Sequence, residues 1–308
     1  FVFGEDVGKR GGVFRVTEGL FDKYGPLRII DSPLAESVIV GAAIGAAMND
    51  TLPVAEIQFA DFIAPAFNQI VQEDARIRYR SNGDWNVPMV IRAPYGGGIH
   101  GALYHSQSIE AIFCHVPGLK VVAPATPYDV KGLMRSAVRD DDPVIFIESL
   151  ALYDTKGEVP RDEDYTLPIG VAEVKRAGTD VTVVSYSRMT VVALQVAQNL
   201  AQEGISVEVV DLRSLRPLDR TTIIESVKKT NRAVVLEEDW YSYGIGAEIA
   251  ATIQEGAFDY LDAPVLRVAG VEVPLPYAAK LSQASKPGAP DLIRAIKRVL
   301  EGGKQWPK

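Results

Sequence analysis

The sequence predicts an α/β protein with two doubly wound domains, in which helices cover both faces of mostly parallel sheets. Short apolar runs alternate with helical segments over the first 150 residues, and a second alternation of the same kind begins at residue 181. A charged, turn-rich stretch with Pro160 and Pro168 separates the two. A chain of 308 residues suits two domains, because one domain usually takes about 100–200 residues. We expect the first domain at 1–155, a linker at 156–175 and the second domain at 176–308.

The elements expected in the first domain follow from apolar runs of strand length and from longer segments with helical periodicity. The expected strands are 1–4, 28–30, 53–58, 88–93, 119–123 and 143–147. The expected helices are 17–24, 36–49, 62–80, 108–114 and 127–139. Since strands and helices alternate, we expect the strands to run parallel with both faces of the sheet covered.

The helix expected at 36–49 is unusual in composition. From Val38 to Met48 its residues are apolar or small almost all round, so we expect it to be buried rather than amphipathic. Glu36 lies in its first turn, where a carboxylate favourably faces the positive end of the helix dipole. That electrostatic role explains Glu36 without any function, and a buried carboxylate in a ligand site is the alternative.

The second domain repeats the alternation of strands and helices. Its expected strands are 181–186, 206–212, 232–238 and 263–270. Its expected helices are 190–203, 219–229, 244–257 and 289–300. We find no internal sequence repeat between the two domains.

Composition limits the class of protein. A net charge of −8 and a pI near 5.1 provide no basic surface for phosphates, so we exclude nucleic acid as a partner. The single Cys114 excludes an intramolecular disulfide and is typical of a reducing compartment. No apolar run reaches transmembrane length, so we expect no membrane partner. We expect a bacterial cytoplasmic protein, with the mitochondrial matrix as the alternative, because Phe1 begins directly in a strand and the native N-terminus is expected to lie upstream.

An amide and two aromatic side chains stand at the end of one expected strand, in the segment Glu56–Phe62. In parallel α/β sheets, ligands bind at the carboxyl ends of the strands. Gln58, Phe59 and Phe62 would therefore lie near the turn that carries Glu36. A carboxylate, an amide and aromatic faces together suit a flat heterocycle that contains nitrogen.

Other motifs are weaker. The glycine-rich loop Tyr95–Gly101 lacks the P-loop pattern, and Gly244–Ile249 has Ile where a dinucleotide fingerprint requires its third glycine. The sequence contains no GxSxG elbow, so Ser106 beside His105 does not indicate a hydrolase. His105 follows the glycine loop, which allows either a structural role or a place at the ligand edge.

The sequence resembles the β subunit of the thiamine-diphosphate-dependent E1 component of 2-oxo acid dehydrogenase complexes. Six segments match that family in their order along the chain and in their spacing. They are 4–20, 31–36, 56–62, 105–108, 115–124 and 211–219. The resemblance covers nearly the whole chain. It implies a transketolase-like, pyrimidine-binding N-terminal domain and a transketolase C-terminal-like domain.

The resemblance implies roles for five residues. Glu36 matches the glutamate that hydrogen-bonds the pyrimidine ring of thiamine diphosphate, and Phe62 matches the aromatic residue that stacks on that ring. Leu34 and Gln58 match positions that line the cofactor pocket. His105 matches a histidine in the active-site channel, near the incoming lipoyl group. Glu36 and His105 are the expected catalytic residues.

The same resemblance implies partner subunits, and so does one motif that the sequence lacks. Thiamine enzymes hold the diphosphate through Mg²⁺ on a motif that contains Gly-Asp-Gly, and this sequence has no such string. We therefore expect an E1 α subunit to hold Mg²⁺ and the diphosphate, in an α2β2 heterotetramer that passes its acyl group to the E2 lipoyl acyltransferase.

The substrate is expected to be a small 2-oxo acid. Glu238–Trp240 and Val273–Tyr277 look closer to pyruvate-type enzymes, so we place pyruvate first. Residues 56–62 and 102–108 look closer to branched-chain-type enzymes, and acetoin dehydrogenase β subunits are a further alternative. A scaffold without catalysis is disfavoured, because the Glu36 and Phe62 positions are intact.

An acidic turn follows the helix 127–139. The resemblance implies a structural K⁺ site there, since hard cations prefer oxygen ligands. A solvated acidic turn is the alternative. The implied ligands are the carbonyls of Met89, Ala137 and Val138 with the carboxylates of Asp140 and Asp142.

Overall fold

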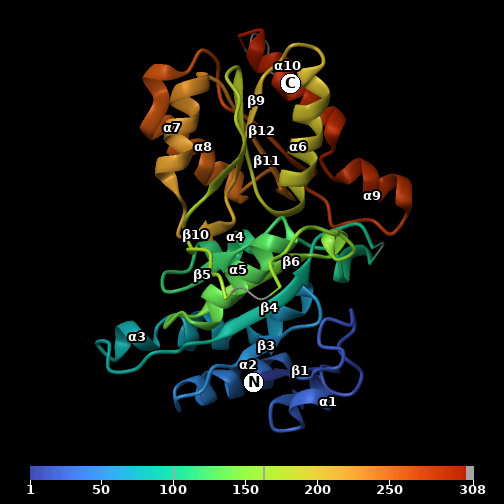
Figure 1. Ribbon diagram of the computed structural model, residues 1–308, viewed down its shortest axis with the longest axis vertical. Coiled ribbons are helices and arrows are strands. Elements are labelled where there is room, and N and C mark those ends of the chain that lie inside the picture. The colour runs from blue at the N-terminus through green and yellow to red at the C-terminus, as the bar shows by residue number, and fades with distance from the viewer. Residues whose placement is uncertain (100, 162–163, 303–308) are drawn as a thin grey trace.

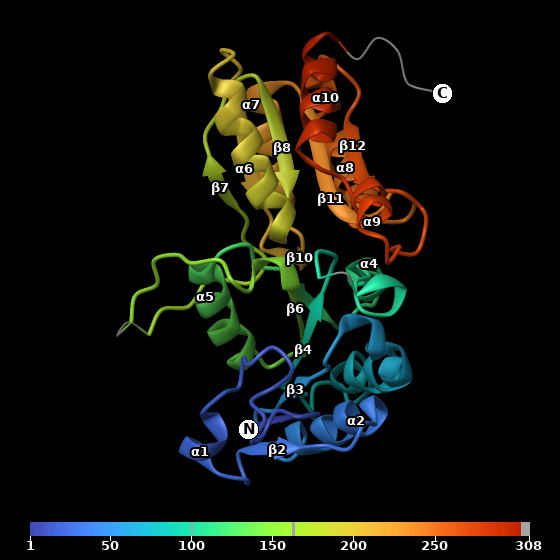
Figure 2. The same ribbon diagram turned by 90° about the vertical axis from the view of Figure 1, so that its right-hand side faces the viewer.

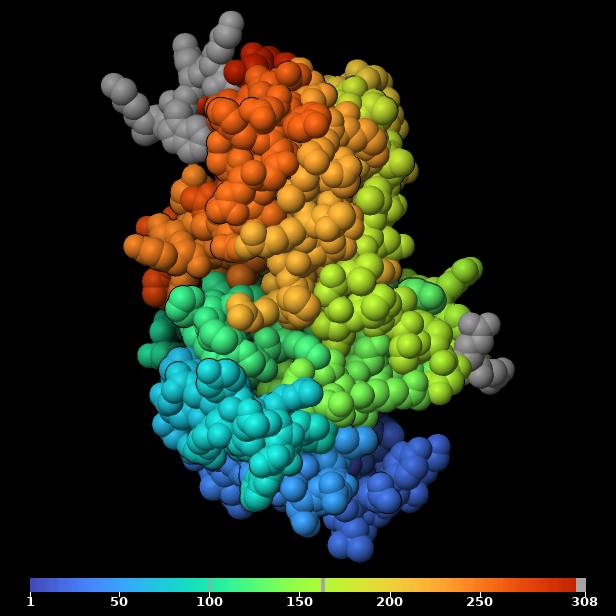
Figure 3. All heavy atoms as spheres, turned by 90° about the vertical axis from the view of Figure 1, so that its left-hand side faces the viewer, coloured from blue at the N-terminus to red at the C-terminus, as the bar shows by residue number. Residues whose placement is uncertain are grey.

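Two sheets organise the residues that the computed structural model describes, which are 1–99, 101–161 and 164–302. Residues 100, 162–163 and 303–308 lie outside these ranges. Each sheet belongs to one layered α/β unit, and the two units are stacked end to end (Figure 1). The space-filling view of Figure 3 shows the blue and cyan N-terminal part at one end of an elongated molecule and the orange C-terminal part at the other.

Among the described residues, seven strands form the first sheet in the order β10-β5-β6-β4-β3-β1-β2. All pairs are parallel except β10 with β5. Gly4 pairs with both Asp31 and Glu56, so β1, β2 and β3 end at the same level. The strands are β1 (Val2–Gly4), β2 (Ile29–Asp31), β3 (Val54–Glu56), β4 (Val90–Tyr95), β5 (Lys120–Val122), β6 (Val144–Ser149) and β10 (Ser214–Arg216).

The helices of the first unit differ from prediction at two places. The single helix expected at 62–80 is wrong, because the chain forms a 3-10 helix, a π-helix and a short α-helix there, and Pro65 cannot donate a helical hydrogen bond. Gly19 has a left-handed φ of 79°, so the first helix begins only at Leu20. The helices are α1 (Leu20–Tyr24), α2 (Glu36–Ala47), η1 (Ala60–Ala66), η2 (Gln69–Asp74), α3 (Ile77–Arg80), η3 (Ala102–Tyr104), α4 (Glu110–Cys114), α5 (Pro127–Val138) and η4 (Leu150–Leu152).

Helix α2 is not buried all round, contrary to expectation. Ile39, Val40 and Ala43 pack in the core, whereas Val38 is 54% exposed and Ala42 lies on the same exposed face. Both faces of α2 are apolar, but the rest of this chain packs against only one of them. No helix in the described part of the chain is both long enough and apolar enough to cross a membrane.

The second sheet has the order β12-β11-β8-β9-β7, with β7 antiparallel to β9. Helices α6 and α10 cover one face and α7 and α8 the other (Figure 1). Its strands are β7 (Glu173–Arg176), β8 (Val181–Ser185), β9 (Val207–Asp211), β11 (Ala233–Trp240) and β12 (Leu266–Gly270). Its helices are α6 (Ser187–Ala201), α7 (Arg220–Thr230), α8 (Ile245–Ala257), η5 (Phe258–Tyr260), α9 (Ala279–Ser285) and α10 (Ala289–Leu300). Sequence reasoning missed β7, β10 and α9, which are short and carry little periodicity.

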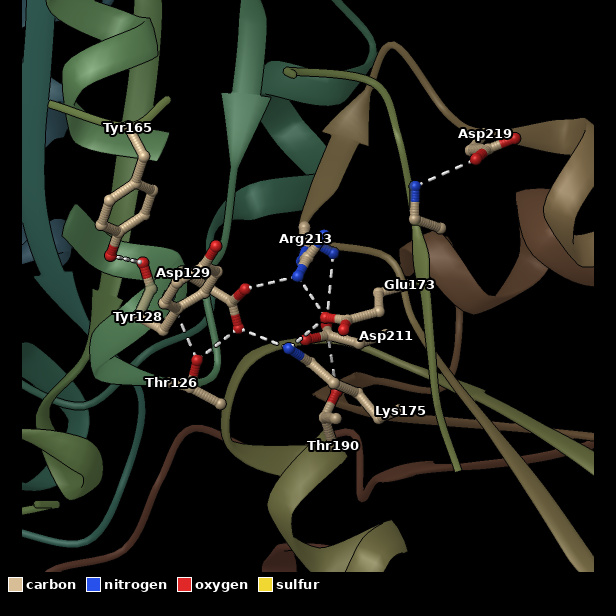
Figure 4. Close-up of polar contacts among 11 residues, drawn as sticks. Thr126, Tyr128, Asp129, Tyr165, Glu173, Lys175, Thr190, Asp211, Arg213 and Asp219 are labelled. Carbon is tan, nitrogen blue, oxygen red and sulfur yellow. Dashed lines mark hydrogen bonds and ion pairs between the residues drawn. The ribbon is translucent and has the colours of Figure 1, made fainter. Parts of the chain in front are cut away.

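Buried ion pairs join the two units (Figure 4). Asp129, in the first turn of α5, is fully buried. Its carboxylate lies 2.8 Å from Lys175 Nζ and 2.8 Å from the Arg213 guanidinium, and both cations also pair with Glu173. Because an unpaired buried charge is strongly disfavoured, these contacts fix how the second sheet sits on the first. Figure 2 shows β10 reaching down from the second unit into the first.

Candidate active site

The carboxyl ends of four parallel strands meet at one edge of the first sheet, where ligands of such folds bind. Glu5 follows β1, and Glu36 begins α2 shortly after β2. Gln58 follows β3, and His105 comes after the glycine loop that leaves β4. The topology therefore places the predicted residues on neighbouring connections.

Aromatic rings form one side of this edge. The His105 ring lies edge-on to Phe59, with centroids 4.6 Å apart, and to Phe62, with centroids 5.1 Å apart. Phe59 and Phe62 are themselves 5.7 Å apart, and Phe14 packs on Phe59 at 5.3 Å. Two predicted residues, Phe62 and His105, are thus in contact, and Phe14 was not foreseen.

Polar groups form the other side. Gln58 Nε2 lies 3.5 Å from the Glu5 carbonyl oxygen and 3.4 Å from Asp6 Oδ2. Burial raises the pKa of Glu5, and the negative charges of Asp6 and Glu36 raise it further, which places Glu36 near this group. Helix α2, which carries Glu36, packs against η1, which carries Phe62.

The Glu36 carboxylate is available for a ligand. It is half-buried and makes no hydrogen bond or ion pair with any residue that the structure describes. Leu34, the other predicted pocket residue on this connection, is 73% exposed. The described residues of this chain therefore leave Leu34 and part of Glu36 open to solvent.

Below the rings, Asp61 ties the His105 segment to η1. Asp61 Oδ2 accepts a hydrogen bond from the Gln107 backbone N–H at 3.3 Å. Burial raises the pKa of Asp61, and the hydrogen bond from Gln107 and the nearby His105 oppose that rise. Gly96 N–H donates to the Gln107 carbonyl at 3.2 Å, so the glycine loop is tied to the same segment.

A buried ion cluster supports the aromatic side. Arg92 donates to both oxygens of Glu148 at 2.7 Å, to Glu56, and to the Tyr153 hydroxyl at 2.9 Å. Tyr153 in turn packs against Phe14 at 5.5 Å. Burial disfavours the charge of Arg92, but the carboxylates of Glu148 and Glu56 raise its pKa overall.

Sequence reasoning missed this cluster, although a signal was present. Arg92 interrupts the apolar run of β4, and Glu148 interrupts that of β6. Because a charge in a strand covered on both faces requires a buried partner, the two strands should have been paired through these residues.

Phe14 and Tyr153 also line a cavity of about 470 Å³ at the carboxyl ends of β5 and β6. Its walls are mostly apolar and include Pro127 and Leu152. Phe14 therefore contacts both Phe59 of the candidate site and this second space.

The predicted potassium ligands lie elsewhere, at the amino-terminal edge of β4 and β6. Lys120 Nζ is 2.6 Å from Asp140 and 3.2 Å from Asp142, and Asp142 also pairs with Arg78. The Met89 carbonyl accepts a hydrogen bond from Val144 N–H at 3.0 Å. A carbonyl oxygen has a second lone pair, so a cation could still bind there, but it would share both carboxylates with Lys120.

The potassium site stays a prediction with a direct test. We expect KCl to raise the thermal midpoint of the protein more than NaCl at equal concentration, and Asp140→Ala to abolish the difference. Asp141→Ala, which removes an exposed carboxylate from the same turn, is the matched control and should keep it. Equal midpoints of the wild-type protein in both salts would contradict the potassium site and leave Lys120 and Arg78 as the partners of the two carboxylates.

Comparison with known proteins agrees with this architecture. Residues 1–156 match the family model of the transketolase pyrimidine binding domain, and residues 170–292 match that of the transketolase C-terminal domain. A solved structure titled split gene transketolase, inactive beta4 tetramer, superimposes with a TM-score of 0.78 at 26% identity, covering 97% of this chain and 91% of that chain.

Curated relatives are similar along almost the whole chain. The 2-oxoisovalerate dehydrogenase subunit beta of Bacillus subtilis (strain 168) is 54% identical over 97% of this chain and 92% of its own length. The pyruvate dehydrogenase E1 component subunit beta of the same organism is 47% identical with the same coverage. A mitochondrial pyruvate dehydrogenase E1 subunit beta-2 from Oryza sativa subsp. japonica is 46% identical over 97% of this chain and 80% of its own length. The chain therefore belongs to the family of β subunits of 2-oxo acid dehydrogenase E1 components, built from transketolase-type pyrimidine-binding and C-terminal domains.

Proposed function

We propose that this chain contributes the aminopyrimidine half of a thiamine diphosphate site in an E1 enzyme that decarboxylates a 2-oxo acid. One observation carries the proposal. The free carboxylate of Glu36 lies at the same strand-end edge as the amide of Gln58 and the rings of Phe62 and His105. Thiamine diphosphate, when bound, supplies the electron sink that decarboxylation requires.

The residues present suit that cofactor. Glu36 offers an oxygen that can accept or share a proton at a ring nitrogen, and its half-buried position strengthens such a hydrogen bond. Phe62 offers an aromatic face, and Gln58 is fixed by its contacts with the turn after β1. His105, which packs edge-on against two phenylalanine rings, can donate or accept a proton on the substrate side.

A second subunit completes the site in this proposal. The sequence has no Gly-Asp-Gly motif for a Mg²⁺-bound diphosphate, so we assign Mg²⁺ and the diphosphate to an E1 α subunit in an α2β2 assembly. The exposed apolar face of α2 and the exposed Leu34 support a partner at this edge. The E2 lipoyl acyltransferase then accepts the acyl group. We place the enzyme in the bacterial cytoplasm, because two of its similar relatives come from Bacillus subtilis, with the mitochondrial matrix as the alternative.

The sequence alone placed pyruvate first as substrate, but the relatives favour a different 2-oxo acid. Identity is 54% to the 2-oxoisovalerate enzyme and 47% to the pyruvate enzyme of one organism, with equal coverage. Because both comparisons cover the same shares of the two chains, the difference in identity favours a branched-chain 2-oxo acid over pyruvate.

A substrate panel tests this proposal. We expect the enzyme assembled with its α subunit to decarboxylate 2-oxoisovalerate with a kcat/KM at least about 10-fold above that for pyruvate, the range that a few methyl groups provide in an apolar pocket. Acetoin, which has no carboxyl group to lose, is the third substrate, and turnover of all three is followed as reduction of an artificial electron acceptor. A preference for pyruvate or acetoin would overturn the substrate, and the absence of turnover with all three would overturn the proposed function.

A further inference from the structure

The glycine loop that leads to His105 is held by the second domain. Gly97 N–H donates a 2.7 Å hydrogen bond to Glu238 Oε1, across 141 residues of sequence. Glu238 lies near the end of β11 and is 8% exposed. A buried carboxylate that accepts a backbone N–H forms a charge-assisted bond, stronger than one between neutral groups.

Two cations of the second domain support this contact. Arg188, at the start of α6, lies 3.4 Å from Glu238 Oε2 and 3.5 Å from the Gly97 carbonyl oxygen. Lys286 packs so closely that a Cβ on Gly97 would lie 2.7 Å from its Cδ. The carboxylate thus has a counter-charge, and a side chain at Gly97 would have to displace the end of Lys286 and press on Glu238.

The contact reaches the candidate active site in two steps. Gly96 N–H, next to the clamped Gly97, donates to the Gln107 carbonyl at 3.2 Å. Gln107 N–H donates to Asp61, and two residues before Gln107 the His105 ring packs on the phenylalanines. Glu238 and Gln107 also line one small cavity of about 20 Å³, which leaves little space for the segment to shift.

We propose that Glu238 is a positioning residue that clamps the Gly97 backbone and so fixes the segment carrying His105 against Phe59 and Phe62. The second domain then takes part in the reaction centre of the first domain. The predicted effect of the clamp on catalysis rests on the proposed function. The clamp itself is independent of what the enzyme decarboxylates.

Hydrogen exchange tests the clamp in the full-length chain. Glu238→Ala is expected to speed amide exchange in the stretch 96–108 by about 10-fold, because the lost bond is charge-assisted and buried. Exchange in β6 should not change. Glu238→Gln keeps an acceptor oxygen and should restore part of the protection, whereas the exposed Glu255→Gln is the matched control and should match wild type. Unchanged exchange of 96–108 in Glu238→Ala would overturn the clamp.

Kinetics of the assembled enzyme test whether the clamp affects catalysis. Decarboxylation is measured with an artificial electron acceptor, and acyl transfer is measured to a lipoyl domain. We expect Glu238→Ala to slow acyl transfer by about 10-fold more than decarboxylation, with His105→Ala showing the same pattern and Glu238→Gln an intermediate one. Equal loss in both half-reactions, or no loss in either, would overturn the positioning role. Absence of any turnover in the wild-type enzyme would instead be a failure of the proposed function, and exchange alone would then decide on the clamp.

Discussion

Glu36→Gln is expected to lower the turnover of the assembled enzyme by at least about 100-fold, the usual range for a lost acid–base partner. Gln has the same size and can still hydrogen-bond, but it carries no negative charge. Glu36 has no other partner among the described residues, so the substitution leaves no charge unpaired. The measurement is kcat for CO₂ release under saturating cofactor.

The fold should survive that change. Glu36 occupies the first position of α2, where losing the charge costs roughly 0.3–1 kcal/mol through the helix dipole. Circular dichroism and the thermal midpoint should therefore stay close to those of wild type. Glu225→Gln, which removes an exposed carboxylate in the second domain, is the control and should keep full turnover. Turnover near the wild-type value in Glu36→Gln would leave the residue with its helix-dipole role alone.

Arg92→Met is expected to destabilise the chain by about 3–5 kcal/mol, because it leaves the carboxylates of Glu56 and Glu148 buried without their cation. Equilibrium unfolding in urea measures the change. Arg294→Met, which removes an exposed arginine from a surface pair, is the control and should unfold like wild type.

The destabilisation should also depend on pH. Burial already raises the pKa of Glu56, and Arg92 partly opposes that rise. Without Arg92, the folded state holds protons on this cluster that the unfolded state has released, so the free energy of unfolding falls as pH rises. The difference between variant and wild type should thus be smaller at pH 5 than at pH 8. A constant difference would mean that the cluster stays charged without the arginine.

The fold was largely predictable because buried parallel strands leave a simple pattern. Runs such as residues 144–147 are apolar on both faces, and helices separate such runs at regular distances. The failures have physical causes. Pro65 breaks an otherwise helical segment, and β10 is three residues long and pairs with β5 far away in sequence, which no local pattern encodes.

The candidate site was predictable only in part. Glu36, Gln58 and Phe62 follow strand ends, and strand ends of one parallel sheet share an edge, so their proximity follows from topology. The contact between His105 and Phe62 depends on the path of the glycine loop. That path is fixed by Glu238 from the other domain, a contact that sequence spacing does not reveal.

The central claim is that this chain holds one half of a thiamine diphosphate site and that an α subunit holds the other. Release of labelled CO₂ from a carboxyl-labelled 2-oxo acid tests it most directly, with the chain alone, the α subunit alone and the reconstituted pair, each supplied with thiamine diphosphate and Mg²⁺. We expect CO₂ from the pair and none above background from either subunit. Robust CO₂ release by this chain alone would contradict the claim.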